Sequence, residues 1–326
     1  MDNTNIKNSY KYASQKSKEK EYFWMTIFTP AYQREKTMKR LYKSLIDIKL
    51  PKDQNGNIVE FEWLIIDDGS TDGTEELVSK WCKENILPIR YYYQKNQGKH
   101  VAENFATLHS RSEMVLTMDS DDTLLPNALE VFYSEWQKID NKQEYKGITC
   151  RSIDPETGEI MGSKLPSNTY YFDANTRDMR LKYHIKGEMC GFNRLDLKKA
   201  YPFPTPDDRM RFCPEDIVWY EMAKKYKERI VDIPVRKYYK DTSNSITGKN
   251  KNRSISNYYF WQYMVNNLLS YMIYSPITIL KSIVGMSMDG FNTDRSVKQI
   301  LNDIKPLLGK ILVTIFIPAG FILSKR

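Results

Sequence analysis

The sequence predicts an α/β fold in which a mostly parallel central sheet is flanked by helices. Between residues 22 and 118, short apolar runs typical of buried strands alternate with segments whose apolar residues recur at helical spacing. This alternation favours parallel strands joined by right-handed helical crossovers. Two of the apolar runs end abruptly in clustered carboxylates, and open α/β sheets bind their ligands at the carboxyl ends of strands. We therefore expect one ligand-binding sheet.

The elements of the first half can be taken in order. The expected strands are Met25–Thr29, Glu62–Ile66, Ile89–Tyr93 and Met114–Met118. Helical spacing marks the segments that contain Met38, Leu41, Leu45 and Ile48, and then Val101, Phe105 and Leu108. A further helix should follow the second strand, where Thr71 or Asp72 can cap it and Glu75 and Glu76 suit its positive N-terminal end.

The pattern becomes mixed after Pro126, and the chain ends in a helical region. The expected elements are a helix at 127–138, a strand at 147–151, a return to the sheet at 185–196, a helix at 217–225 and a strand at 229–239. The predicted organisation is a polar, basic and loose tail at 1–21, a main domain at 22–245 with halves 22–125 and 126–245, and a helical C-terminal region at 246–326.

The last apolar segment, Ile311 to Ser324, is uncharged over 14 residues and has lysines beside it. That length is short for a bilayer span. Two interpretations remain open: an interfacial membrane helix with basic flanks, or an ordinary packing helix of the C-terminal region.

Composition limits the classes of function. The 326 residues carry a net charge of +8, which favours anionic partners such as nucleotide diphosphates, acidic lipids or nucleic acid. No basic and aromatic stripe of the single-strand-binding type is present, so nucleic acid is not expected as a partner. The four cysteines are isolated, which argues against a zinc site or disulfide framework and suits a reducing cytosol. The polar N-terminus does not look like a secretory signal.

The apolar run at 114–118 ends in three carboxylates within four residues, Asp119, Asp121 and Asp122. Clustered carboxylates repel one another, so packing does not explain them unless a cation lies among them. A hard divalent ion that holds a phosphorylated ligand would supply that charge. The alternative is a solvated acidic turn that caps the next helix. Asp119 and Asp121 are two residues apart and can face one ligand, whereas Asp122 is expected to point away and support the turn.

Four short motifs occur in order over about a hundred residues: TPAYQ, IIDDGSTDGT, NQGKHVAEN and DSDD. In sequence and spacing they resemble the nucleotide-sugar-binding half of family 2 glycosyltransferases, whose fold is the Rossmann-like GT-A fold. The resemblance implies that Asp121 ligates Mn²⁺ or Mg²⁺ between the donor phosphates, and that Asp119 contacts this metal or the ribose. It also implies that Asp68 accepts a hydrogen bond from the base, usually uracil, and that Pro30 and Tyr32 line the base pocket.

Three more residues are assigned to the donor by the same resemblance. Lys99 would pair with a phosphate, although a solvated lysine at a helix start is an alternative. Asn104 would orient the donor loop, and Ser120 would contact the donor between the two aspartates. The matching alternative for Pro30 and Tyr32 is a plain strand-to-helix turn.

The candidate for the general base lies in Cys213-Pro214-Glu215-Asp216-Ile217. The family often carries Glu-Asp at a helix start, which implies that Asp216 deprotonates the acceptor hydroxyl and that Glu215 orients the acceptor or the metal. A helix N-terminus keeps a carboxylate ionised at neutral pH, as this role requires. Ordinary capping, with proline in the first turn followed by acidic residues, is the alternative.

The later part of the chain departs from the family pattern. Many relatives carry a histidine in a late loop, whereas residues 239–245 contain none, so that a phosphate contact there would fall to Lys240, Ser243 or Ser245. The Gln-x-x-Arg-Trp signature of processive polysaccharide synthases is also missing, which favours the addition of a single sugar.

Three hypotheses follow. The favoured one is an inverting, metal-dependent glycosyltransferase that uses a nucleotide sugar, UDP-linked by resemblance, and a saccharide or lipid-linked oligosaccharide acceptor in surface polysaccharide or capsule synthesis. The alternatives are a sugar-phosphate nucleotidyltransferase, whose Gly-rich N-terminal loop is missing here, and a non-catalytic membrane- or nucleic-acid-binding protein. We expect a cytoplasmic enzyme that is peripheral on the inner face of the plasma membrane through its C-terminal region.

Overall fold

The computed structural model describes residues 10–166, 169–240 and 253–325, and these form two compact units. The first unit contains the sheet and comprises residues up to Thr176 together with Ile185–Pro202 and Met222–Ser243. The second is helical and comprises Arg177–His184, Phe203–Glu221 and Asn244–Arg326. The predicted boundary at 245/246 lies outside the described residues.

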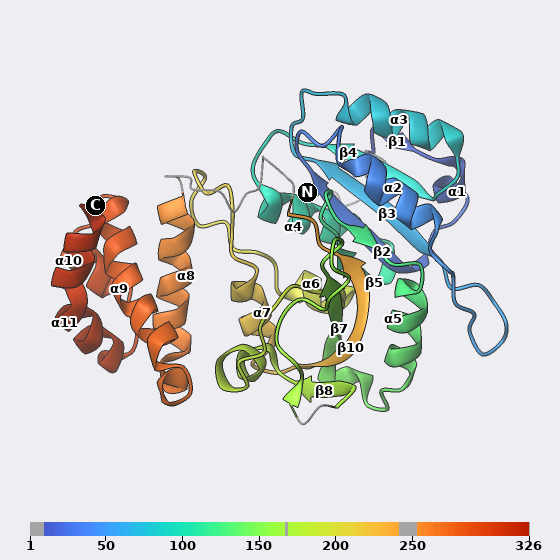
Figure 1. The fold of residues 1–326 in the computed structure, drawn as a ribbon. Helices are drawn as coiled ribbons and strands as arrows, with labels where there is room; N and C mark the ends of the chain where they lie inside the picture. Colours follow the sequence, from blue (N-terminus) through green and yellow to red (C-terminus); the bar gives the residue numbers. More distant parts are fainter. Residues whose placement is uncertain (1–9, 167–168, 241–252, 326) are drawn as a thin grey trace. The chain divides into compact units, whose positions relative to one another are not determined.

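The first unit is built on one 10-stranded sheet with strand order β1-β4-β3-β2-β5-β9-β7-β10-β6, and β8 pairs with β10 (Figure 1). Its core strands β4, β3, β2 and β5 are parallel, as are β7 and β10, whereas β9 runs antiparallel between β5 and β7. The bounds are β1 Tyr12–Ala13, β2 Phe23–Ala31, β3 Phe61–Asp67, β4 Ile89–Tyr93, β5 Ser112–Thr117, β6 Thr123–Leu124, β7 Tyr145–Ile153, β8 Tyr171–Ala174, β9 Met189–Arg194 and β10 Lys227–Lys237. The predicted α/β class with a parallel core is confirmed.

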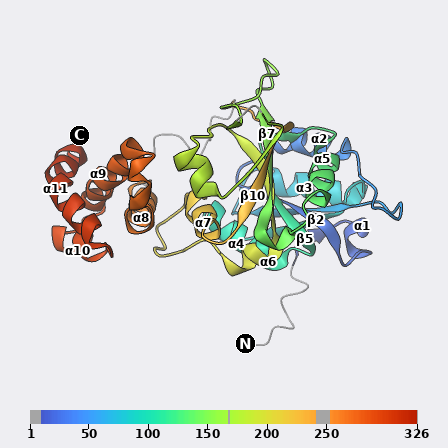
Figure 2. The ribbon, with the colours of Figure 1, turned by 90° about the horizontal axis from the view of Figure 1, so that it is seen from below.

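Helices cover both faces of this sheet (Figures 1 and 2). Because successive side chains of a strand point to opposite faces, each core strand feeds two layers of apolar packing. One layer contains Trp63 and Ile65 of β3 with helices α2, α3 and α5, and the other contains Leu64 and Ile66 with α4 and α6. The helices of this unit are α1 Gln15–Lys18, α2 Met38–Ile46, α3 Thr74–Glu84, α4 Lys99–His109, α5 Ala128–Gln137 and α6 Leu195–Ala200, with a 3₁₀ turn at Lys142–Glu144.

Residues 10–21 differ from the expected loose tail. Tyr12 and Ala13 form the edge strand β1, which pairs antiparallel with β4, and Ser14 caps the short helix α1 through the backbone N–H of Ser17. Ser14 and Ser17 are both buried. A strand of two residues is too short to show a periodic pattern in the sequence. The polar composition of this segment therefore suggested a loose tail.

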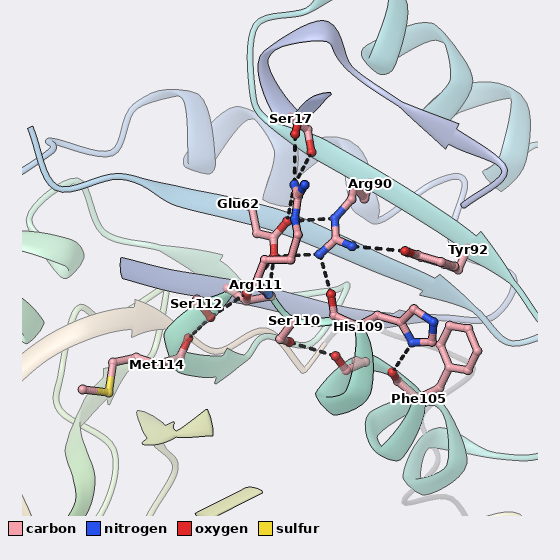
Figure 3. Close-up of polar contacts among 12 residues, drawn as sticks. Ser17, Glu62, Arg90, Tyr92, Phe105, His109, Ser110, Arg111, Ser112 and Met114 are labelled. Carbon is pink, nitrogen blue, oxygen red and sulfur yellow. Dashed lines mark hydrogen bonds and ion pairs between the residues drawn. The ribbon is translucent and has the colours of Figure 1, made fainter. Parts of the chain in front are cut away.

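A buried charge cluster lies at the amino-terminal edge of the parallel strands (Figure 3). The Glu62 carboxylate accepts two hydrogen bonds from the Arg90 guanidinium, at 2.9 and 2.8 Å, and Arg111 Nη2 lies 3.2 Å from the same carboxylate. Burial alone would raise the pKa of Glu62, but the two arginines outweigh it and hold the pKa below its ordinary value. Arg111 also donates to Ser17 Oγ at 3.0 Å, so this cluster ties the N-terminal segment to the sheet.

The second unit contains helices around an apolar core of its own. They are the π-helical turn η3 Asp178–Lys182, α7 Asp216–Met222, α8 Arg253–Asn267, η4 Leu269–Ile273, α9 Pro276–Asn292, α10 Val297–Asn302 and α11 Leu307–Ser324. Helix α11 packs closely on α9, since a Cβ added at Gly320 would lie 2.4 Å from Ser287 Cβ.

Helix α11 is longer than the uncharged run seen in the sequence. It spans 18 residues with a mean hydropathy of 2.1, and within the described residues it is the one helix long and apolar enough to cross a bilayer by length and composition. Only 17% of that segment is buried, while the side chains of Leu312, Phe316 and Ile317 pack against the core of the second unit. The interfacial helix and the packing helix both stay predictions. The exposed apolar side chains of α11 are Leu307, Leu308, Ile311, Ile315, Phe321, Ile322 and Leu323.

Candidate functional site

The first, second and fourth motifs meet at the carboxyl edge of the parallel strands. In register, Ala31 at the end of β2 is opposite Asp67 at the end of β3, and Phe28 of β2 is opposite Thr117 at the end of β5. The loops that follow these three strands therefore leave the sheet side by side. This is the edge at which an open α/β sheet binds its ligand.

The loops after β2 and β3 are joined by hydrogen bonds. Gln33, which has a positive φ of 56°, accepts through Oε1 from the backbone N–H groups of Thr71 and Asp72, both at 3.0 Å. This bonding fixes the first two motifs as one surface. Pro30 is half-buried on that surface, whereas the Tyr32 side chain is 48% exposed and can meet a ligand.

The two aspartates of the second motif have different surroundings. Asp67 is fully buried and accepts from the Ser70 N–H at 2.7 Å and from the Tyr91 hydroxyl at 2.7 Å. Burial raises the pKa of Asp67 above its ordinary value, against the effect of these donors. Asp67 therefore shapes the turn from inside the fold.

Asp68 fixes the loop that leads into helix α4. Its Oδ1 accepts from Gln94 Nε2 at 2.7 Å and the Gln97 N–H at 2.8 Å, and its Oδ2 accepts from the Gly98 N–H at 2.7 Å. A carboxylate has about four acceptor positions, and three are used here. The contact of Asp68 with a base stays a prediction, and the structure adds a loop-holding role that its place in the motif did not reveal.

Lys99 and Asp119 join the third motif to the fourth. Lys99 is the first residue of α4, and its ammonium nitrogen lies 2.8 Å from Asp119 Oδ1. Burial would raise the pKa of Asp119, but Lys99, and then Arg236 and Arg34, hold it below the ordinary value. Asn104 is half-buried on the same helix. The site thus contains an ionised carboxylate that is surrounded by cations.

The rest of the acidic loop is held from within the protein. Ser120 and Asp122 are buried, while Asp121 is half-buried. Asp122 Oδ2 lies 3.3 Å from the guanidinium of Arg236, which is itself buried on β10. Burial, with repulsion from Asp119 and Asp121, raises the pKa of Asp122 to about 7 in spite of this arginine. As expected, Asp122 supports the turn.

Arg236 and Arg40 are site residues that the sequence analysis missed. Arg236 lies more than a hundred residues after the acidic loop, and Arg40 precedes the loop by about eighty; neither belongs to a motif that could have revealed it. Arg40 donates through Nε to the backbone carbonyl of Asp121 at 2.7 Å. Only the fold brings these side chains to the loop.

Asp216 and Glu215, the candidates for acceptor activation, belong to the helical unit. Asp216 is the first residue of α7, and the backbone carbonyl of Glu215 accepts from the Val218 N–H at 3.0 Å. Both side chains are half-buried. The predicted helix start is confirmed, and the catalytic role stays a prediction. Ser243 and Ser245 lie outside the described residues, and Lys240 pairs with Asp154 at 3.3 Å.

The donor atoms at the carboxyl edge fit a metal only in part. Among the described residues, no three His, Cys, Asp or Glu side chains come together to enclose an ion. The carboxylates of Asp119 and Asp121 are hard oxygen ligands, which suit Mg²⁺ or Mn²⁺, and Mg²⁺ is commonly held by one or two carboxylates together with substrate phosphates. The residues present therefore fit a metal that arrives with, and is completed by, a diphosphate.

Comparison with known proteins decides the family. Residues 26–201, which are more than half of the chain and include all four motifs, match Glycosyl transferase family 2. The chain belongs to that family. The match favours the first of the three hypotheses over the nucleotidyltransferase and the non-catalytic binding protein.

Similar proteins fall into two groups. Chondroitin synthase of Escherichia coli is 32% identical over 47% of this chain and 20% of its own length, and a dolichyl-phosphate beta-glucosyltransferase of Trichomonas vaginalis is 28% identical over 36% of each. The chain thus spans well under half the length of these curated relatives. Among solved structures, S. aureus TarS 1-349 in complex with UDP shares the fold, with a TM-score of 0.55 over 93% of this chain and 90% of that one at 14% identity.

Proposed function

We propose that the protein is an inverting, metal-dependent glycosyltransferase that moves one sugar from a UDP-linked donor to a hydroxyl of a saccharide or lipid-linked oligosaccharide. The observation that carries the proposal is the Lys99–Asp119 pair at the edge where the family motifs meet. A sugar nucleotide brings a diphosphate, which requires cations, and a metal, which requires carboxylates. The solved TarS structures with UDP and with UDP-GlcNAc support a uridine nucleotide as donor.

The chain's own residues would bind and orient the donor. Lys99 stands in the first turn of α4, where its ammonium group and the positive helix end both favour a phosphate. Asp121, with Asp119, would hold Mn²⁺ or Mg²⁺, which when bound offsets the charge that develops on the leaving diphosphate. Pro30, near the end of β2, and Tyr32, just after it, would face the base. Ser120 would contact the donor between the two aspartates, and Asn104 would orient the donor loop.

Asp216 would accept the proton of the acceptor hydroxyl as the acceptor oxygen bonds to the anomeric carbon and the bond to the nucleoside diphosphate breaks. Its position at the start of α7 favours the ionised carboxylate that this step requires. Attack from the face opposite the leaving group inverts the anomeric configuration. Glu215, the preceding residue, would orient the acceptor.

Helix α11 supports a place at a membrane. Its exposed apolar side chains, with Lys310 in its first turn and Lys325 just after its last residue, suit the boundary between acyl chains and acidic headgroups. Such a location would give the enzyme access to a lipid-linked acceptor on the cytoplasmic face of the plasma membrane. Surface polysaccharide or capsule synthesis is the corresponding process.

The test is calorimetry with UDP in the presence and absence of Mn²⁺. Wild-type protein should bind UDP in a Mn²⁺-dependent manner, and Asp121→Ala should lose that dependence, whereas Asp47→Ala, which removes an exposed carboxylate from the end of α2, should behave as wild type. UDP binding that depends on neither Mn²⁺ nor Asp121 would show that the proposed metal-binding role is wrong. A screen of nucleotide sugars then identifies the donor, because release of UDP indicates glycosyl transfer. A nucleotidyltransferase would instead release pyrophosphate when it is given UTP and a sugar 1-phosphate.

A further inference from the structure

Two arginines and a tyrosine hold the acidic loop from both sides. From helix α2, Arg40 Nε donates to the backbone carbonyl of Asp121 at 2.7 Å, and the same guanidinium lies 3.8 Å from the centre of the Tyr239 ring. Tyr239 follows strand β10, and its backbone N–H donates to Asp122 Oδ1 at 2.9 Å. Arg40 therefore contacts the loop directly and also contacts the residue that holds the next aspartate.

Strand β10 supplies the other half of this arrangement. Arg236 is 5% exposed, and its guanidinium reaches Asp122 Oδ2 at 3.3 Å. Its Nε donates to Ser152 Oγ at 2.8 Å on β7, and its second terminal nitrogen lies 3.4 Å from Glu188. Because Arg236 is anchored on neighbouring elements, the orientation of Asp122 is fixed relative to the sheet.

We propose that Arg40, Tyr239, Asp122 and Arg236 form a clasp that sets the geometry of the acidic loop for donor and metal binding. The proposal rests on the proposed function, because it assigns the clasp to that same donor site. These are positioning residues: they act through Asp121 and Asp122 and are not assigned a contact with substrate.

The clasp counteracts the repulsion between the carboxylates of the acidic loop. Three carboxylates within four residues repel one another, and without constraint the loop would open to separate them. The bond from Arg40 ends on the main-chain oxygen of Asp121, so it fixes the loop without using a carboxylate oxygen. Partners of metal ligands that lie behind them commonly change metal affinity or activity by about 10- to 100-fold when they are mutated.

Arginine is needed at position 40 for its shape as well as its charge. A planar guanidinium can stack on a ring while one of its N–H groups donates sideways, whereas a lysine ammonium is a point charge on a flexible stem. Arg40→Lys therefore keeps the charge near the donor site and removes the stacking geometry. Arg40 is half-buried on the surface of the sheet unit, so this variant should fold. Arg236 is less suitable because loss of a buried ion-pair partner is strongly destabilising.

The experiment compares wild type with Arg40→Lys, Tyr239→Leu and the double variant. UDP affinity is measured by calorimetry at saturating Mn²⁺, and amide hydrogen exchange is measured over residues 118–124 without nucleotide. Each single variant should weaken UDP binding by about 10- to 100-fold and speed exchange in the loop. The double variant should be little worse than Arg40→Lys alone, because that change already removes the contact between the guanidinium and the Tyr239 ring. Lys39→Gln, at the exposed neighbouring position of α2, is the matched control and should bind UDP as wild type does.

The outcomes separate the clasp from the proposed function. Wild-type UDP affinity in Arg40→Lys would show that charge alone matters and would overturn the clasp while leaving the donor site intact. Unchanged exchange over residues 118–124, or additive losses in the double variant, would overturn it as well. A wild-type protein that binds no UDP under any condition would refute the proposed function. It would also refute the role of the clasp in donor binding.

Discussion

Lys99 Nζ lies 2.8 Å from Asp119 Oδ1, so a cation of the protein already occupies one of the two carboxylates proposed to hold a metal. The Asp119 side chain is 38% exposed, which leaves it accessible to a ligand. In the proposed function, the donor diphosphate would offer Lys99 a second anionic partner, and Asp119 would become available to a metal. Until then the pair would keep this carboxylate ionised.

We predict opposite effects of Lys99→Met on the two ligands. Without nucleotide, Mn²⁺ should bind the variant more tightly, because the ammonium group no longer competes for Asp119. UDP in the presence of Mn²⁺ should bind more weakly by about 1.5–3 kcal/mol, the range for a hydrogen bond to a charged group. Calorimetric titrations with each ligand measure both effects. Lys95→Met, at an exposed lysine of the preceding loop, should change neither affinity; equal losses in both lysine variants would contradict a specific role for Lys99.

Asp216→Asn should separate binding from transfer. The amide cannot accept the acceptor proton, so the transfer rate should fall by about 10²- to 10⁴-fold, the usual contribution of a positioned general base. The affinity for UDP should stay at the wild-type value, since the donor motifs lie in the sheet unit. Single-turnover transfer assays and UDP titrations give the two numbers. Asp208→Asn removes an exposed carboxylate from the same segment as a control, and a wild-type transfer rate in Asp216→Asn would refute its role as the base.

Glu62→Gln should destabilise the fold by about 3–5 kcal/mol, because it leaves the buried Arg90 and the partly buried Arg111 without their common counter-charge. Glu60→Gln is the control: its pair with Lys20 is about 40% exposed on both sides and should be worth about 0–1 kcal/mol. Urea unfolding followed by circular dichroism measures both. Similar decreases in the free energy of unfolding of the two variants would show that the buried cluster stabilises the fold no more than an exposed ion pair does.

The same residue predicts a pH dependence. The pKa of Glu62 is lowered in the folded protein, so the unfolded chain binds the proton more readily. The stabilising contribution is therefore complete above the unfolded value of about 4.3 and is lost as the pH falls below it. Wild type should lose stability over that acid range more steeply than Glu62→Gln. Parallel urea titrations between pH 3 and pH 6 test the difference, and identical slopes would refute it.

Ile315→Glu should release the protein from membranes. Ile315 is 63% exposed on α11, and burial of such a side chain in the acyl boundary is worth about 1.5–3 kcal/mol, or roughly a tenfold or greater change in partition. Flotation with vesicles of phosphatidylglycerol and phosphatidylcholine measures the bound fraction. Leu108→Glu makes the same kind of change at a 70% exposed position on α4 of the sheet unit and should leave partition unchanged. Equal partition of Ile315→Glu and wild type would show that the exposed apolar face of α11 does not bind the membrane.

Much of the sheet could be predicted because its strands are long enough to show a pattern. Ile89–Tyr93 was predicted to the residue, and Met25–Thr29 lies inside the observed β2. The short strands β1, β6 and β8, of two to four residues, were missed because they present too few residues for a period to appear. Their places depend on pairing with strands distant in sequence, which no local window contains.

The motif residues of the site could be predicted from the sequence, but the residues that hold them in place could not. Asp119 and Lys99 were each assigned to the donor, and the structure brings them into contact. Arg40 and Arg236 could not be found, since an arginine outside a motif looks the same on a solvated surface and beside a carboxylate. Asp68 shows the converse limit: its motif indicated a ligand contact, while its three hydrogen bonds to the loop at 94–98 depend on a chain segment about thirty residues later.

The two ends of the parallel strands differ in their response to ionic strength. Glu62 and Arg90 are shielded from solvent, so added salt should hardly weaken their pair, whereas Asp119 is open to mobile ions and its pair with Lys99 should separate as the Debye length shortens. Concentrated salt would then weaken donor capture in a protein whose sheet stays intact. Turnover measured in buffers of different salt content would therefore report the occupancy of the binding edge and not the fraction of folded enzyme.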